Sequence, residues 1–486
     1  MTIPSKTNLR VTKTVRGITV DFVDESADPF DYCYVPIEHG GGAKIMNRKY
    51  ELKAENVDDE GGFNVAFRNH VEQCFSFDLE RRDSAKKLML LGGIRYLLPV
   101  IKAAQKMGVY VITADYLPDN IAHRYSDEYV NVSIIDKEAV LAVAQRLKID
   151  GILSFACDPG VVSAAYVAEK MGLPFQCSYE SACILQDKGL FRKFLTEHGF
   201  NCPHAKRYTD ASEPLKDIDF FTWPVIVKPV DSAGSKGVTK VERPEDLEGA
   251  IETALSGSHC SSFIIEDFIT FESCHSSTDP FTIDGKLTAV SYSDQLFDKD
   301  ADNPYTPAFI IWPTTMKQEH QDYLTREIQR LMDLLHVKTG IYNIETCVGK
   351  GGIPYIMEVS PRGGGCKIAE LQEMAFGANL IENEVRKALD MPLTKINTRP
   401  IDGHWCEMII HARPGQQGIF DRLDIRDDVM SRNVKCIDMS AKKGDIVHPF
   451  TGANMSLGDM FLQFDSREEL NGRIADTSEW MGIKLS

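Results

Sequence analysis

No stretch of this 486-residue sequence approaches the roughly 20 consecutive apolar residues that a membrane-spanning helix needs. The first residues, Met1 to Lys6, contain none of the apolar core of a secretory signal. Hydrophobic residues make up 43% of the chain and charged residues 26%, and these proportions are typical of a globular protein. We therefore expect a cytoplasmic protein that has no membrane partner.

Acidic residues outnumber basic ones, with 71 aspartates and glutamates against 54 lysines and arginines. The formal net charge is −17, and no basic stripe with interleaved aromatic residues occurs anywhere in the sequence. Proteins that bind nucleic acids grip phosphate backbones with clustered lysine and arginine, so the composition argues against such a partner. It does not exclude a single nucleotide, because a few local cations and a metal ion can hold a triphosphate inside an acidic protein.

Closely spaced cysteines are missing as well. The chain has twelve cysteines, and no two of them form a C-x-x-C pair. Zinc sites and disulfide frameworks normally show such spacing, so we expect free, mostly buried thiols. Cys366 is singled out because it directly follows a run of three glycines.

Residues 1–86 carry no chemical motif, and we predict an N-terminal extension of unknown role. Residues 11–23 alternate loosely between apolar and polar types and could form a pair of strands. From residue 87 to about 180, short apolar runs alternate with helical patterns, which predicts a doubly wound parallel α/β sheet. The turn at Gly92 and Gly93 does not complete G-x-G-x-x-G, so it does not support a nicotinamide cofactor.

A different pattern begins near residue 181. Residues 183–198 read as one helix, and the apolar strand over 225–229 contains a single charge, Lys228. The loop over 231–237 follows this strand and is rich in glycine and serine. Backbone amides and hydroxyls of such a loop can cradle phosphate oxygens, although a loop of this kind alone is more often a plain turn. A lysine on a buried strand needs an anionic partner, and a nucleotide phosphate would provide one.

The predicted hairpin over residues 340–360 concentrates the acidic chemistry. Residues two apart on a strand share a face, so Glu345 and Glu358 could face one another across the paired strands. Two close carboxylates favour a cation between them, and Mg²⁺ is commonly held by one or two carboxylates together with substrate phosphates. The alternative is a solvent-facing polar side of an amphipathic hairpin. Arg362 follows directly, and it could stabilise a transferring phosphoryl group or be an ordinary loop arginine.

The order of these motifs along the chain resembles the motif pattern of the ATP-grasp superfamily, over roughly residues 87–400. The quoted elements are Lys188 at a helix start, Lys228 before the Gly/Ser loop, the segment 266–269, Glu345, and the segment 358–362. Within that superfamily the chain looks most similar to L-amino acid ligases and phosphoribosylglycinamide synthetase-like proteins. The resemblance implies a Rossmann-like domain over 87–180 and a two-lobed ATP-grasp domain over 181–400, with a small lobe at about 200–270 and a large lobe at about 271–400. An extra C-terminal lobe would cover 401–486.

The resemblance also assigns roles. Lys188 and Lys228 would contact ATP phosphates, Glu266 and Ile269 would receive the adenine, and Arg362 would lie near the transferring phosphate with Lys228 as its catalytic partner. The implied cofactors are ATP and Mg²⁺, with Mn²⁺ as an alternative metal. The remaining implied site residues are the phosphate loop positions Ser232, Ser235 and Gly237 and the metal ligands Glu345, Glu358 and Ser360.

Two departures from the family pattern stand out. Ser360 occupies a position where asparagine is usual, and the acidic residue past the hinge is out of register, with Asp279 fitting that pattern better.

The function implied is an ADP-forming ligase that activates a small carboxylate as an acyl phosphate and joins it to an amine. The alternatives are a non-catalytic ATP-binding regulatory protein and a biotin-carboxylase-like enzyme. A homodimer is compatible with the sequence, and the identity of the acid and the amine is not encoded in any motif.

Overall fold

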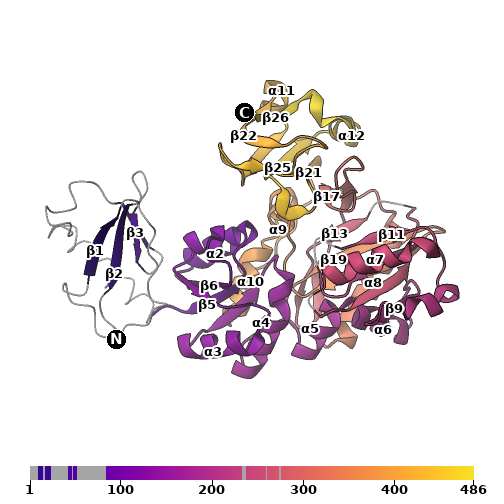
Figure 1. Cartoon of the computed structure of the whole chain (residues 1–486), viewed down its shortest axis with the longest axis horizontal. Coiled ribbons are helices and arrows are strands. Elements are labelled where there is room, and N and C mark those ends of the chain that lie inside the picture. Colours follow the sequence, from indigo (N-terminus) through magenta and orange to yellow (C-terminus); the bar gives the residue numbers. More distant parts are fainter. Residues whose placement is uncertain are drawn as a thin grey trace. The chain divides into compact units, whose positions relative to one another are not determined.

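The structure is a computed structural model, and it describes four strands before residue 52 and then residues 84–486 apart from 233–236, 259 and 273–274. The chain divides into two compact units. The first consists of Met1–Pro174 with Ala388–Met391, and the second of Phe175–Lys387 with Pro392–Ser486. Figure 1 labels helices and strands of both units and colours them along the sequence. No helix in these described ranges has both the length and the apolar character required to cross a bilayer.

The first unit contains the expected parallel sheet. Its strand order is β7-β6-β5-β8, and all three pairings are parallel. Strands β5 and β6 are buried along almost their whole length, as expected for strands covered on both faces by helices. The elements are β5 (Lys87–Leu91), α2 (Leu98–Lys106), β6 (Tyr110–Asp115), β7 (Glu128–Asn131), α3 (Lys137–Leu147), β8 (Gly151–Ser154) and α4 (Asp158–Met171).

The predicted strand pair near the N-terminus is present. Strands β1 (Leu9–Thr14) and β2 (Gly17–Phe22) pair antiparallel, and so do β3 (Gly42–Ile45) and β4 (Arg48–Glu51). The rest of the predicted N-terminal extension, up to residue 83, lies outside the described residues.

The second unit begins with a pair of helices where the sequence predicted one. α5 (Tyr179–Gln186) ends and α6 (Lys188–Glu197) begins at Asp187, which is extended with φ −97° and ψ 112°. The prediction of one continuous helix over 183–198 is therefore wrong. The physical reason is capping: the Asp187 carboxylate accepts a hydrogen bond from the Leu190 amide and so starts a new helix.

A four-stranded antiparallel sheet follows, with strand order β11-β10-β12-β9. Helix α7 (Leu247–Ser256) packs on β10, and the core between them contains Val225, Val227, Ile251 and Ile265. The strands are β9 (Ala205–Tyr208), β10 (Val225–Pro229), β11 (Thr239–Val241) and β12 (Phe263–Asp267).

Two three-stranded sheets come next, in the orders β13-β19-β20 and β15-β14-β18. Helix α8 (Gln318–Leu334) buries Leu324, Ile328, Leu331 and Met332, which lie on one face of the helix, and it packs on β20. The strands are β13 (Ser276–Thr278), β14 (Phe281–Ile283), β15 (Lys286–Ala289), β18 (Gly340–Ile341), β19 (Asn343–Gly349) and β20 (Ile353–Ser360).

A five-stranded antiparallel sheet, in the order β16-β17-β21-β25-β23, joins residues on both sides of position 400. Its core is the cluster that includes Ile311, Met408, Met460 and Phe464. A smaller sheet, β24-β22-β26, belongs to the same C-terminal region. The elements are β16 (Asp294–Phe297), β17 (Pro307–Trp312), α9 (Ile368–Phe376), α10 (Leu380–Ala388), β21 (His404–Ile410), β22 (Gly418–Ile425), α11 (Asp427–Arg432), β23 (Val434–Met439), β24 (Ile446–Val447), β25 (Gly458–Phe464), α12 (Arg467–Ala475) and β26 (Met481–Leu485).

Candidate active site

Two carboxylates face one another on the hairpin of β19 and β20. Glu345 and Glu358 are direct cross-strand partners, and Asn343 pairs with Ser360 two positions further along. Burial raises the pKa of Glu345 to about 7, and the negative charge of Glu358 adds to the shift. The strands thus bring together two acids that repel one another, which is the arrangement predicted from the spacing.

This pair fits a divalent cation. A cation between the two carboxylates would remove the repulsion that raises the pKa of Glu345. Among the described residues no group of three or more histidine, cysteine, aspartate or glutamate side chains is placed to hold a metal. Two protein carboxylates are nevertheless the usual complement for Mg²⁺ when substrate phosphates supply further oxygens.

Lys188 lies beside the carboxylate pair. Its ammonium nitrogen is 3.6 Å from Glu358 Oε2 and donates a hydrogen bond of 2.9 Å to the carbonyl of Ser232. The Lys188 backbone amide also donates to the carbonyl of Val230. The start of α6 is therefore tied both to the acidic hairpin and to the beginning of the predicted phosphate loop.

Lys228 has an anionic partner within the protein. Its ammonium group forms an ion pair with Glu266 on the neighbouring strand β12, and the Glu266 side chain is only 4% exposed. Burial lowers the pKa of Lys228, and the negative charge of Glu266 opposes that shift. Lys188, Arg362 and Lys228 each favour the charged form of Glu345 and so oppose the rise of its pKa.

Arg192 is a functional candidate that the sequence reading missed. Its Nε is 2.9 Å from Glu266 Oε2, and its Nη1 donates to the carbonyl of Met357, next to Glu358. Although burial disfavours the charged form of Glu266, Arg192 and Lys228 lower its pKa to about 2. The available signal was the spacing: Arg192 follows Lys188 by four residues and so lies on the same face of α6.

The phosphate loop is described only in part. Ser235 lies outside the described residues, whereas Ser232 and Gly237 lie within them. Gly237 has φ +71°, and a Cβ there would come within 2.9 Å of Pro229, so glycine is needed at the end of the loop. Asp231, where the loop begins, accepts hydrogen bonds from Ser258 Oγ and the Cys260 amide.

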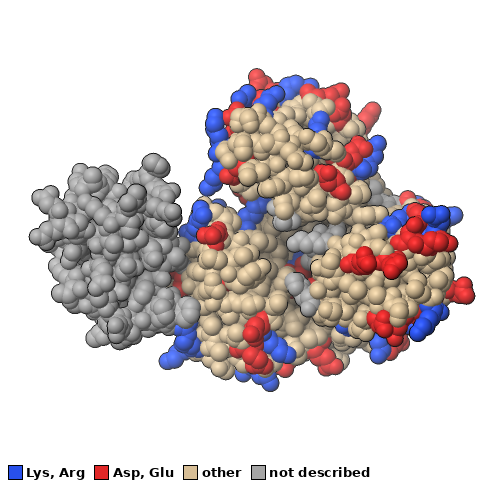
Figure 2. Space-filling view, in the orientation of Figure 1, with Lys and Arg blue, Asp and Glu red and all other residues tan. Residues whose placement is uncertain are grey.

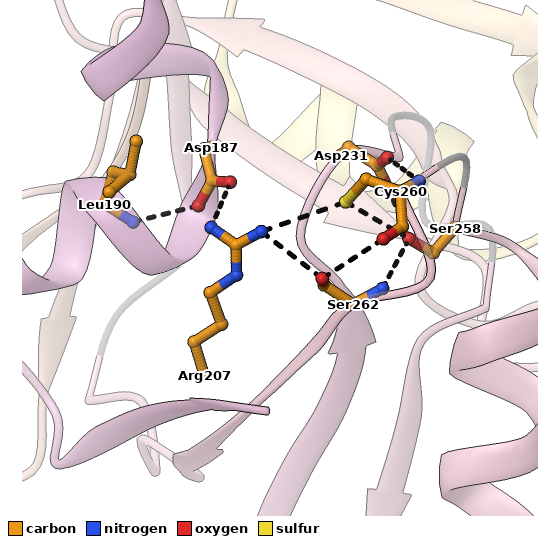
Figure 3. A network of polar contacts seen from close by, with 7 residues as sticks. All are labelled: Asp187, Leu190, Arg207, Asp231, Ser258, Cys260 and Ser262. Carbon is orange, nitrogen blue, oxygen red and sulfur yellow. Dashed lines mark hydrogen bonds and ion pairs between the residues drawn. The ribbon is translucent and has the colours of Figure 1, made fainter. Parts of the chain in front are cut away.

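A polar network connects this point to the start of α6 (Figure 3). The Arg207 guanidinium donates to Asp187 on one side and to Ser262 Oγ on the other. The Ser262 amide in turn donates to Ser258 Oγ, which donates to Asp231. The network holds the helix cap at Asp187 and the loop residue Asp231 in a fixed relation.

The glycine run after Arg362 is anchored by a buried acid. The Gly364 amide and the Asn343 side-chain amide both donate to Asp279, which is fully buried. Burial raises the pKa of Asp279 to about 6, although these two hydrogen bonds oppose the shift. A Cβ at Gly364 would lie within 2.8 Å of Asp279 Oδ1, which explains the glycine. Asp279 thus sets the course of the chain next to Arg362.

The remaining site residues predicted from the sequence are Ser360 and Ile269. Ser360 Oγ accepts a hydrogen bond of 2.6 Å from the Gln186 side chain. Ile269 lies two residues beyond the end of β12. The metal role of Ser360 and the adenine roles of Glu266 and Ile269 stay predictions.

Acidic and basic side chains are interspersed over the described residues on the face drawn in Figure 2.

The nine free cysteines of the described residues include Cys366, which packs against the apolar cluster of Ala301, Ile409 and Phe450. Cys366 therefore has a packing role.

Comparison with known proteins finds an ATP-grasp domain in the middle of the chain. The model of the ATP-grasp domain matches residues 185–366. A formate-dependent phosphoribosylglycinamide formyltransferase of Synechococcus sp. (strain WH7803) is 29% identical over 189 residues, which are 38% of this chain and 48% of that protein. The chain thus spans about half the length of this relative. The protein of the same name from Methanocaldococcus jannaschii is 25% identical over 70% of this chain and 85% of that protein.

A solved structure shows the same fold over a longer stretch. The L-amino acid ligase from Bacillus licheniformis superposes with a TM-score of 0.69 at 20% identity, and the match covers 82% of this chain and 99% of that one. The matched segment 185–366 contains Lys188, Lys228, Glu345, Glu358 and Arg362. The resemblance stated from the sequence motifs is confirmed over residues 185–366, which match the ATP-grasp domain.

Proposed function

We propose that this protein is an ATP- and Mg²⁺-dependent ligase that activates a small carboxylate as an acyl phosphate and joins it to an amine. The observation that carries the proposal is the facing pair of Glu345 and Glu358, with Lys188 beside Glu358 and with Lys188, Arg362 and Lys228 offsetting the charge of Glu345. A carboxylate and a triphosphate repel one another, and this repulsion is the central difficulty in bringing them together. Such a cluster can hold both anions at the same place.

The reaction proceeds in two steps. A carboxylate oxygen of the acid attacks the γ-phosphorus of ATP, the bond from that phosphorus to the bridging oxygen breaks, and ADP leaves. The amine nitrogen then attacks the acyl carbon, phosphate departs, and the nitrogen loses a proton. Neither step requires a covalently modified side chain, so the protein acts by positioning reactants and offsetting charge.

The chain's own residues divide this work. Lys188 and Lys228 offset the negative charge of the phosphates, and Arg362 stabilises the transferring phosphoryl group. Glu345 and Glu358 would hold Mg²⁺ with Ser360 as a third, shorter ligand. When bound, the metal supplies positive charge to the phosphate oxygens. Glu266 and Ile269 would receive the adenine, and the loop of Ser232, Ser235 and Gly237 would cover the phosphates.

The alternative of a non-catalytic nucleotide-binding protein rests on Ser360, because the serine hydroxyl is a shorter ligand than the asparagine usual in the family. The acidic pair together with Lys188, Lys228 and Arg362 supports turnover instead, since binding alone does not require an arginine at the transferring phosphate.

The test is a screen of carboxylate and amine pairs for phosphate release from ATP by the full chain. The proposal predicts phosphate and ADP only when a suitable acid is present, and an amide product only when a suitable amine is added. MgADP binding without turnover on any pair would favour the regulatory alternative. Turnover with bicarbonate and biotin alone would indicate a carboxylating enzyme.

A further inference from the structure

Arg192 occupies a position that ties together three elements of the candidate site. It lies on α6, four residues after Lys188, and it is 3% exposed. Its Nε donates to Glu266 on β12, and its Nη1 donates 2.8 Å to the carbonyl of Met357 on β20. Each of the three elements also carries a charged residue of the candidate site. These residues are Lys188 on α6, Glu266 on β12, and Glu358, which directly follows Met357, on β20.

The Glu266 carboxylate is divided between two cations. Oε1 accepts from the ammonium of Lys228, and Oε2 accepts from Arg192. All three side chains are at most 13% exposed, so water does not screen this group strongly. With Arg192 bound to Oε2, the interaction of Lys228 is confined to Oε1.

This division decides where the Lys228 ammonium lies. An ammonium has three donors, and in the observed arrangement one of them is used by Glu266. Without Arg192, the buried Glu266 carboxylate would keep Lys228 as its cationic partner, and both of its oxygens would be available to Lys228. The ammonium would then be drawn toward Glu266 and away from a phosphate.

We propose that Arg192 is a positioning residue that, by occupying one oxygen of Glu266, holds the Lys228 ammonium in place to receive a nucleotide phosphate. This inference rests on the proposed function, in which Lys228 contacts ATP. It adds a residue that touches neither nucleotide nor substrate and acts through Glu266.

A purely structural role for Arg192 is the competing explanation. Breaking a buried ion pair by removing one partner destabilises a protein strongly, whatever the pair does for function. Stability alone therefore does not discriminate between the two roles. Nucleotide affinity does, provided that it is measured with and without Glu266.

The experiment measures MgADP affinity by titration calorimetry, together with thermal unfolding, for the full chain. The variants are Arg192→Met, Arg192→Lys, Glu266→Gln and the double variant R192M/E266Q. Lys193→Met is the matched control, because Lys193 is the next residue on α6 and its side chain is 69% exposed. The double variant removes both Arg192 and the buried carboxylate that R192M alone would leave with one cation fewer, and it leaves the Lys228 ammonium without its Glu266 partner.

We expect R192M to weaken MgADP binding roughly tenfold and R192K to weaken it less, while K193M stays within about twofold of the unaltered chain. In the E266Q background the same Arg192→Met change should alter affinity by less than about twofold, because the residue through which Arg192 acts is gone. If R192M does not fold, R192K compared with and without E266Q should show the same loss of effect.

Two results would overturn the inference while leaving the proposed function intact. One is a lower unfolding temperature for R192M with unchanged MgADP affinity, which would make Arg192 structural only. The other is an equal loss of affinity in both backgrounds, which would mean that Arg192 acts independently of Glu266. Failure of the unaltered chain to bind MgADP would instead overturn the proposed function, and the inference with it.

Discussion

Glu345 and Glu358 lie directly opposite one another on β19 and β20, and the burial of Glu345 together with the charge of Glu358 raises the pKa of Glu345 to about 7. Two acids held this way destabilise the protein unless a cation lies nearby. Lys188, Arg362 and Lys228 supply part of that compensation. The remaining deficit supports the proposal that the pair holds a divalent cation.

Replacing Glu358 with Gln should abolish turnover and leave the fold intact, because an amide of the same shape removes the charge but keeps the side-chain volume. Phosphate release and circular dichroism measure the two effects. Glu319→Gln is the control, since that side chain is 71% exposed on α8. Near-native activity of E358Q in limiting Mg²⁺ would show that the metal site is elsewhere.

Arg362→Ala should lower kcat by on the order of 10²–10³, the usual cost of removing a group that stabilises the transition state. The same change should affect the KM for ATP much less, since Arg362 is assigned to the transferring phosphate. Arg243→Ala serves as a comparison because its side chain is 69% exposed and pairs with Asp246 in the neighbouring turn. A loss confined to KM would assign Arg362 to ground-state binding.

Asp279→Ala should destabilise the protein by about 1–3 kcal/mol, because the Gly364 amide and the Asn343 side chain would lose a buried acceptor. Asp279→Asn keeps one acceptor oxygen and should cost less. Chemical denaturation measures both. Equal stability of the alanine variant and the unaltered chain would mean that water replaces the carboxylate.

Acid should weaken the protein partly through Glu266. Its pKa falls from the ordinary 4.5 to about 2, because Arg192 and Lys228 outweigh the effect of burial. A lowered pKa stabilises the fold above the unfolded value and is lost as pH falls, so the contribution disappears between about pH 4.5 and 2. It amounts to at most roughly 3 kcal/mol.

The stability difference between the unaltered chain and Glu266→Gln should therefore shrink over that pH range. Denaturation at several pH values below 5 measures it. A difference that stays constant would show that the charge of Glu266 is not what stabilises the fold.

Much of the fold follows from local patterns. The alternation of buried strands and helices after residue 87 predicted the parallel sheet, and the spacing of Glu345 and Glu358 predicted their facing arrangement. The break at Asp187 was not predicted, because an apolar periodicity that continues through a capping residue looks like one helix. Only the extended backbone at Asp187 separates α5 from α6.

Contacts between residues far apart in the sequence were the other feature that could not be predicted. Lys228 was correctly expected to need an anion, but the identity of that anion as Glu266 depends on which strands pair. Arg192 could not be joined to Glu266 across 74 residues of sequence without the structure. The pairing of β17 with β21 likewise depends on tertiary contacts that no local pattern encodes.

The central claim is that the carboxylate of the substrate acid attacks ATP directly. An acid labelled with ¹⁸O in its carboxylate, incubated with ATP, Mg²⁺ and the amine, tests it through mass spectrometry of the released phosphate. The account predicts one labelled oxygen in the phosphate, with ADP as the other product. Label found only in AMP, with pyrophosphate released, would mean that the acid is adenylated and would contradict the account.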